Sequence, residues 1–252
     1  MGTIVGNIDL ANVSLILFTL FFFALVVYLN MENAREGYPL EDDEGNPSMP
    51  GLFPLAKPKT FKLPHGQGSV TVPNNDTDRH RDFAMVQTSP SPGMPFVPTG
   101  DPLVDGIGPA AWAERRDQPE LDGKGHPKII PMRNAESFVV SNGRDPRGLP
   151  VQAHDGEVVG KISDLWVDES EQLVRYLEFE LNEGGGTRLV PMQLARIRSN
   201  RVAIHALNGK HFANVPTTKK TDQVTKLEEE KICAYYCGGK LYAADDRLEP
   251  QI

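Results

Sequence analysis

Two polar turns in the second half of the chain hold side chains that can carry protons. Residues 120–126 combine two carboxylates, a lysine and a histidine with two glycines, which predicts an exposed loop suited to proton entry. Residues 168–171, Asp-Glu-Ser-Glu, lie between two predicted strands and can project carboxylates towards a partner. Carboxylates and imidazoles are the usual proton carriers in proteins because their surroundings readily shift their pKa values. The two turns are therefore candidate sites of proton transfer.

Each of these residues also has a purely structural interpretation. Asp122 stands beside a glycine, where aspartate commonly orders a turn. His126 precedes Pro127 in a loop, as an ordinary surface histidine does. Glu171 and Arg175 suit a surface ion pair worth under about 1 kcal/mol. The other five histidines share no ligand spacing and are expected to be structural: His65, His80, His154, His205 and His211.

An apolar segment near the N-terminus sets the layout of the chain. Residues 10–31 contain no Asp, Glu, Lys or Arg, and Asp9 and Glu32 stand at the two ends. A helix of this length spans about 33 Å, enough to cross a hydrocarbon core of about 30 Å. A cleaved signal peptide would need a basic N-terminal region and a shorter apolar core. We therefore expect residues 10–31 to be a retained transmembrane helix, preceded by a short segment, 1–9.

Charge and cysteine content restrict the class of protein. Basic residues first appear at Arg35, so the positive-inside rule predicts a periplasmic N-terminus and a cytoplasmic C-terminal domain. A net charge of −8 argues against nucleic-acid binding. Cys233 and Cys237 are too few for a disulfide framework, and structural thiols are expected rather than a metal site.

Residues 32–127 are predicted to form an extended surface segment rather than a domain. Thirteen of the 21 prolines lie between Pro39 and Pro109, and proline removes backbone donors and prevents long helices. A flexible linker is the alternative, but apolar residues recur along the segment: Tyr38, Leu40, Leu52, Phe53, Leu55, Phe61, Leu63, Phe83 and Phe96. We therefore expect it to lie along a partner's surface. Residues 60–63 and 69–72 predict a strand pair, and residues 108–116 a brief helix.

Residues 128–252 are predicted to form a mainly β domain, a small antiparallel barrel closed by a short helix. Alternation in Tyr176 to Leu181 places Leu177 and Phe179 on the face opposite Glu178. Short segments with strand character recur throughout: 129–130, 138–140, 156–168, 176–181, 188–192 and 202–207.

The closing helix has a recognisable start and a predicted end. Residues 225–228, Thr-Lys-Leu-Glu, match a capping box, and the following acidic residues favour the positive end of the helix dipole. Gly238 and Gly239 predict the C-terminal stop.

These pieces, in this order, resemble the H subunit of the purple bacterial photosynthetic reaction centre over nearly the whole chain. Residues 160–168 and 188–192 are similar to the PRC-barrel module of that subunit's cytoplasmic domain. The other stretches that carry the resemblance are residues 35–40, 58–61, 63–66, 98–102, 108–110, 234–235 and 238–239.

The resemblance implies a structural and protonic role, with no enzyme activity of its own. Such a subunit caps the cytoplasmic face of the L and M subunits, stabilises the secondary quinone site and conducts protons to it during light-driven electron transfer. No cofactor is expected on this chain, because bacteriochlorophyll, bacteriopheophytin, quinones, non-haem iron and carotenoid are expected on partner subunits. The complex would lie in the bacterial inner (chromatophore) membrane, where lipids, a cytochrome subunit and a light-harvesting antenna are further candidate neighbours.

By the same resemblance, individual residues acquire expected roles. Glu171 matches the family's carboxylate near the secondary quinone, Arg175 a nearby basic residue, and Asp168 belongs to the same turn. Asp122 and His126 match members of the surface cluster where protons enter and where inhibitory divalent metals bind in some relatives. Lys124 stands where those relatives carry a second histidine, so the resemblance implies weaker inhibition by zinc or cadmium.

Two other classes of protein compete with this interpretation. The sequence contains no G-x-S-x-G, Walker loop, H-E-x-x-H or dinucleotide fingerprint, which disfavours an independent enzyme. A membrane-anchored barrel that binds another assembly is the stronger alternative. Pigment would separate the two, because a reaction-centre subunit purifies with bacteriochlorophyll and a free-standing module does not.

Overall fold

The computed structural model describes residues 9–35, 37, 40, 46, 51, 55–74, 82–135, 138–139 and 143–248. The chain divides into two compact units, Met1–His80 and Arg81–Ile252, and each is considered by itself. Some predictions fall outside the described residues. They concern most of the segment 1–9 and three of the predicted apolar contact residues: Tyr38, Leu52 and Phe53.

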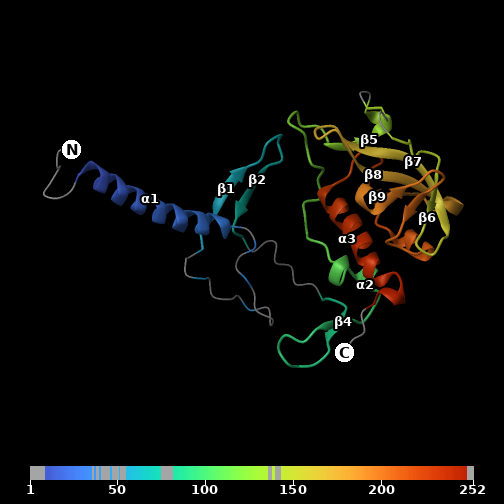
Figure 1. Ribbon diagram of the computed structural model, residues 1–252, viewed down its shortest axis with the longest axis horizontal. Coiled ribbons are helices and arrows are strands. Elements are labelled where there is room, and N and C mark those ends of the chain that lie inside the picture. The colour runs from blue at the N-terminus through green and yellow to red at the C-terminus, as the bar shows by residue number, and fades with distance from the viewer. Residues whose placement is uncertain are drawn as a thin grey trace. The chain divides into compact units, whose positions relative to one another are not determined.

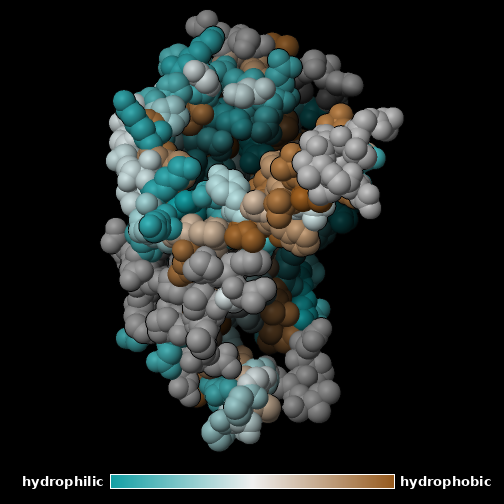
Figure 2. Space-filling model, turned by 90° about the vertical axis from the view of Figure 1, so that its left-hand side faces the viewer, coloured by the Kyte–Doolittle hydropathy of each residue, from teal (hydrophilic) through white to brown (hydrophobic). Residues whose placement is uncertain are grey.

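The first unit begins with the apolar helix α1, Leu10–Asn33 (Figure 1). Asp9 caps its first turn, with a carboxylate oxygen accepting a hydrogen bond from the Asn12 amide at 2.9 Å. None of the helix is buried in the structure, and Phe18, Phe21 and Phe23 are each more than 60% exposed. Apolar side chains accordingly gather at the surface of this helix in Figure 2. The length and composition needed to cross a membrane are both present, as the sequence predicts.

A two-stranded hairpin follows in the same unit, and one arginine joins it to the end of α1. Strands β1, Lys59–Lys62, and β2, Ser69–Val72, pair antiparallel with Lys59 opposite Val72, which confirms the predicted strand pair. The Arg35 guanidinium forms two 2.6 Å hydrogen bonds with the Glu32 carboxylate. It also donates to the carbonyl oxygens of Lys57, at 2.7 Å, and Val72, at 3.3 Å. The Arg35 side chain therefore links the last turn of α1 to the hairpin.

The second unit begins with short elements. Strands β3, Met85–Gln87, and β4, Phe96–Pro98, form a hairpin, and a helical turn, α2, covers Pro102–Asp105. The predicted helix over 108–116 is wrong in extent. Only a 3₁₀ turn, Gly108–Ala110, forms, and the backbone at Ala111 is already extended. Pro109 and the alanines after it predict a longer helix. The chain instead leaves the turn after Ala110, whose side chain is buried in the core.

Seven strands form one curled sheet, the mainly β domain that the sequence predicts (Figure 1). Its path runs β10-β11-β6-β7-β8-β9, and β5 pairs with β7. All pairs are antiparallel except β11 with β6, which is parallel. The strand bounds are β5 Ile129–Pro131, β6 Pro150–Gln152, β7 Val158–Asp168, β8 Leu173–Leu181, β9 Thr187–Pro191, β10 Ala195–Ile197 and β11 Val202–Ile204. A strand expected at 138–140 is absent at Phe138 and Val139, which lie outside regular structure, and Val140 is not described.

Strands β7 and β8 form the centre of the sheet. Leu177 and Phe179 are fully buried, as their alternation predicts. Gly160 faces Leu181 in the partner strand, and a Cβ atom there would overlap the Glu180 carbonyl oxygen. Only glycine therefore allows the two backbones to approach this closely.

The closing helix α3, Lys226–Tyr242, packs along one side of the sheet (Figure 1). Its capping box is confirmed, because Thr225 and Glu228 exchange both expected hydrogen bonds. The predicted stop at Gly238 and Gly239 is wrong, since the helix continues for three residues beyond them. A Cβ on Gly238 would lie 2.5 Å from the Ala110 Cβ, and one on Gly239 would lie 2.7 Å from the Ala206 carbonyl oxygen. These glycines serve close packing rather than helix termination.

Candidate functional site

Lys128, which no local sequence pattern marks, lies at the centre of the candidate site. Lys128 Nζ is 2.8 Å from Glu171 Oε1, 3.3 Å from Asp168 Oδ2 and 3.9 Å from Glu120 Oε1. The carboxylates differ in exposure: the side chain of Asp168 is 2% exposed, whereas those of Glu120 and Glu171 are 47% and 49% exposed. One cation thus joins a buried carboxylate to two that reach solvent. We call these four residues the Lys128 cluster.

The sheet register brings the cluster together. Strand β5 pairs with β7 so that Ile129 lies opposite Asp168, which places the preceding residue, Lys128, beside the end of β7. The Asp168 carboxylate also accepts a 2.9 Å hydrogen bond from the Glu171 amide and so shapes the turn. The turn closes through Gln172, which adopts φ +54° although it is not a glycine. Asp168 therefore both orders the turn and binds the lysine.

The carboxylates hold Lys128 in its charged form. Its hydrogen bond to Glu171 is the largest cause of a raised pKa, and Asp168 and Glu120 act in the same direction. Partial desolvation opposes them but does not prevail. At neutral pH the cluster therefore contains an ammonium group flanked by carboxylates.

The predicted polar loop is tightly organised by Asp122. One carboxylate oxygen of Asp122 accepts hydrogen bonds from the amides of Lys124 and His126, both at 2.8 Å. These backbone donors, that of His126 first, hold the pKa of Asp122 below its usual value. The His126 ring lies farther away, with Nδ1 3.9 Å from Asp122 Oδ2, and its side chain is 75% exposed. Asp122 thus has the turn-ordering role, and His126 presents its imidazole to solvent.

The loop and the Lys128 cluster are directly connected. The Lys128 amide donates to the Glu120 carbonyl oxygen at 2.8 Å, and a β-bridge joins Leu121 to Pro127. The two sequence-predicted turns are therefore neighbours, brought together by residues 120 and 128 at the base of the loop.

The alternative of a surface ion pair between Glu171 and Arg175 does not match the contacts of the described residues. Glu171 forms its ion pair with Lys128, 43 residues away, rather than with Arg175. Burial raises the pKa of Glu229 on α3, and the positive charge of Arg175 acts against that rise. Among the described residues, no three His, Cys, Asp or Glu side chains lie together in a metal-binding group. A metal site at Asp122 and His126 remains a prediction.

A buried polar network lies elsewhere in the sheet and was also missed. The Glu178 carboxylate is only 8% exposed, although the alternation placed it opposite the core residues. It accepts hydrogen bonds from Trp166 Nε1 and Ser163 Oγ, each at 2.9 Å, and from Arg133 Nη1 at 3.0 Å. The same Arg133 nitrogen donates to Asp164 at 3.0 Å. This network is fully paired and has the character of a structural element.

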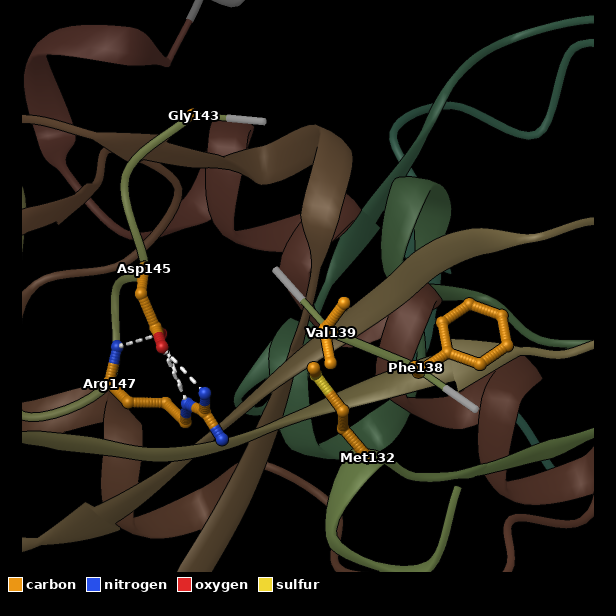
Figure 3. Close-up of a pocket in the computed structure, with 6 residues that line it drawn as sticks. All are labelled: Met132, Phe138, Val139, Gly143, Asp145 and Arg147. Atoms are coloured by element: carbon orange, nitrogen blue, oxygen red, sulfur yellow. Dashed lines mark hydrogen bonds and ion pairs between the residues drawn. The ribbon is translucent and has the colours of Figure 1, made fainter. Parts of the chain in front are cut away.

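A cavity of about 330 Å³ lies apart from these residues, lined by Met132, Phe138, Val139, Gly143, Asp145 and Arg147. In Figure 3 the polar pair faces the apolar residues across this cavity. Asp145 and Arg147 satisfy each other through a 2.6 Å contact between Oδ2 and Nη2, and this bond holds the pKa of Asp145 below its usual value. The cavity contains none of the predicted site residues, and its polar groups are already paired.

The fold and the site define a class of protein: an apolar helix long enough to cross a membrane, followed by a curled β domain with a carboxylate cluster at one strand turn. Residues 138–211 match the PRC-barrel domain family. Residues 2–134, just over half of the 252, match the family described as photosynthetic reaction centre, H-chain N-terminal region. The chain belongs to the photosynthetic reaction centre H-chain family, and it is a reaction-centre subunit. Its apolar helix is compatible with a single-pass anchor in that complex.

Proposed function

We propose that this chain caps the cytoplasmic face of the L and M subunits, stabilises the secondary quinone site and conducts protons towards it. The family match supports a place in the complex, and the Lys128 cluster supports the protonic part. Reduction of a quinone to a quinol consumes two electrons and two protons. A buried quinone can receive those protons only through titratable side chains or ordered water, because free protons do not cross packed apolar protein.

The observation that carries the proposal is the graded exposure of the cluster. Glu120 and Glu171 are about half exposed and can exchange protons with water, while Asp168, held by the same lysine, is buried. The positive charge of the Lys128 ammonium group offsets the electrostatic repulsion among the three negatively charged side chains. A proton taken from solvent therefore has acceptors at successive depths around one cation.

The neighbouring loop would supply the entry point. His126 presents an exposed imidazole to solvent, and Asp122 holds the loop in shape through the His126 amide. Because Lys124 cannot ligate a metal while protonated, zinc should inhibit proton uptake less than in a two-histidine relative. A steady-state zinc titration would test this, and equal micromolar sensitivity would contradict it.

The anchor and its hairpin suit attachment to a membrane complex. A cytoplasmic location for the domain is supported by the basic residues on the C-terminal side of α1: Arg35, Lys57, Lys59 and Lys62. Without strongly polar residues in its middle, α1 would pack on partner helices mainly through van der Waals contact. We propose that pigments, quinones, non-haem iron and carotenoid belong to the partner subunits, and that this chain has no enzyme activity of its own.

The first experiment is an absorption spectrum of the tagged protein purified in mild detergent from its native membranes. Near-infrared bacteriochlorophyll bands that bleach reversibly after a flash are the expected result. A colourless, monodisperse preparation would overturn the proposal and favour an anchored barrel of another assembly.

The second experiment tests the protonic part in the intact complex. Glu171→Gln should slow flash-induced proton uptake severalfold, because it removes a titrating group from the Lys128 cluster while keeping the side-chain size. Glu169→Gln is the matched control, since Glu169 is exposed in the same turn and makes no ion pair within the described part of the chain. Equal uptake rates in the two variants would contradict this role of Glu171.

A further inference from the structure

The hairpin of strands β1 and β2 combines positive charge with an exposed aromatic side chain. Residues 55–74, which the structure describes in full, contain three lysines and neither Asp nor Glu, in a chain whose net charge is −8. The three are Lys57, Lys59 and Lys62, and each is exposed. The hairpin and the residues that lead into it are therefore a local excess of positive charge on an acidic protein.

Strand alternation places one lysine and the aromatic ring on the same face of the hairpin. Lys59 and Phe61 are two residues apart on β1, and Lys59 Nζ lies 5.2 Å from the centre of the Phe61 ring. Their cross-strand partners, Val72 and Val70, are half-buried, whereas Phe61 is 38% exposed. Lys62 follows on the opposite face. The face that carries Lys59 therefore joins an ammonium group to apolar surface.

Arg35 fixes this end of the hairpin beside the end of α1 (Figure 1). Its guanidinium donates to the carbonyl oxygens of Lys57, at 2.7 Å, and Val72, at 3.3 Å, and Val72 is the residue paired with Lys59. Two 2.6 Å hydrogen bonds join the same guanidinium to the Glu32 carboxylate, so the negative charge at this helix end is compensated. With α1 across the membrane, as proposed above, Lys57 and Lys59 lie at the level of the lipid headgroups, which extend about 5–7 Å beyond the hydrocarbon core.

We propose that Lys57, Lys59 and Phe61 bind the headgroup of an anionic phospholipid in the cytoplasmic leaflet. The two ammonium groups pair with the lipid phosphate, and the Phe61 ring lies at the boundary between headgroups and acyl chains. The occupant is a lipid because the lysines stand at the membrane surface, where anionic headgroups are the abundant negative charges. The position of the site at that surface rests on the membrane anchor in the proposed function.

The test is photo-crosslinking in the intact complex, reconstituted into phosphatidylcholine nanodiscs. A trace of phosphatidylglycerol or of phosphatidylcholine carries a photoreactive group beside its headgroup, and peptide mass spectrometry counts the adducts on residues 55–62. Phosphatidylglycerol should label this segment severalfold more than phosphatidylcholine does. Lys59→Gln should lower that ratio about fivefold, because it removes one lysine from the membrane surface. Inorganic phosphate should lower the ratio no more than chloride at equal ionic strength, because the site binds a headgroup held in the membrane.

The matched control is Lys62→Gln, which removes the same charge from the opposite face of the same strand and should leave the ratio close to that of the wild type. Equal labelling by the two lipids, equal losses in the two variants, or no labelling because a protein covers the hairpin would each overturn the proposal. So would specific competition by phosphate, which would indicate a site for a soluble anion. The flash-induced spectrum of the same sample tests the proposed function separately. Bleachable pigment without a lipid preference would reject the headgroup site alone, and a lipid preference without pigment would reject only the place in a reaction centre.

Discussion

Replacement of Lys128 by methionine tests whether one ammonium group stabilises the buried carboxylate of Asp168. The Lys128 side chain is 17% exposed. Methionine keeps much of its aliphatic stem and removes the charged end. Asp168, at 2% side-chain exposure, would keep its hydrogen bond from the Glu171 amide but lose its cation. The domain should therefore become less stable.

The expected loss of stability on Lys128→Met depends on how exposed Lys128 and its carboxylate partners are. Breaking a fully buried ion pair by removing one partner costs about 3–5 kcal/mol. The Lys128 ammonium retains some solvent access, so the expected loss for Lys128→Met is about 2–3 kcal/mol, most of it from Asp168. The half-exposed glutamates add under about 1 kcal/mol each. For a unit of this size, the thermal midpoint should fall by roughly 5–10 °C.

The assay is thermal unfolding of the purified protein, followed by circular dichroism as a function of pH. Because the folded-state pKa of Lys128 is raised, its contribution is fully present below the unfolded-state value of about 10.4. It is lost as the pH rises through the folded-state pKa. As the pH is raised from neutral, the difference between wild type and Lys128→Met should therefore shrink first in strongly alkaline solution.

Two further variants make this prediction refutable. Lys124→Met removes an exposed lysine from the same loop and should change the free energy of unfolding by less than about 0.5 kcal/mol. Lys128→Met combined with Asp168→Asn removes both charges and should recover more than half of the lost stability. If the double variant is no more stable than Lys128→Met, the reasoning about a buried uncompensated charge is wrong.

Three other substitutions have expected outcomes in the same unfolding assay. Gly160→Ala should destabilise the protein by more than about 2 kcal/mol, because the new methyl group meets the Glu180 carbonyl in the paired strand. Trp166→Phe should cost about 1–3 kcal/mol, because it removes one of the donors to the buried Glu178 carboxylate. Thr225→Ala should cost about 1 kcal/mol by removing the α3 cap.

Matched variants serve as controls for these three. Gly123→Ala places a methyl group where nothing lies within 4 Å, so stability close to wild type is expected. Thr225→Ser keeps the capping hydroxyl and should retain most of the stability. For Trp166, the decisive comparison is Glu178→Gln: if Trp166→Phe is equally harmful in that background, charge on Glu178 does not determine the cost.

Local patterns in the sequence predicted most of the elements correctly. The apolar run, the alternation in β8 and the capping box each depend on neighbouring residues, so the sequence alone indicates them. The error at Gly238 and Gly239 has a tertiary cause. A glycine pair after a helical pattern usually ends the helix, but here Ala110 and Ala206 approach so closely that any side chain would collide.

In the candidate site, too, local patterns predict some residues, and tertiary contacts determine the others. Residues 120–126 and 168–171 were recognisable as polar turns, yet the lysine that joins them was not. Lys128 is selected by the pairing of Ile129 with Asp168, a long-range register that no local pattern encodes. Glu178 was similarly assigned to the face opposite the core, and its burial depends on Arg133 and Trp166 from other strands and turns.

The Lys128 cluster crosses the border between the two matched family segments. Lys128 and Glu120 belong to the reaction-centre segment, residues 2–134, whereas Asp168 and Glu171 belong to the barrel segment, residues 138–211. The salt bridges therefore join the two matched segments, and the cluster is complete only when both segments are present. A barrel without its upstream segment would keep a buried carboxylate and lose the cation. Among relatives, replacement of the lysine by a neutral residue is expected to accompany loss of the aspartate's charge, so that the two positions change together.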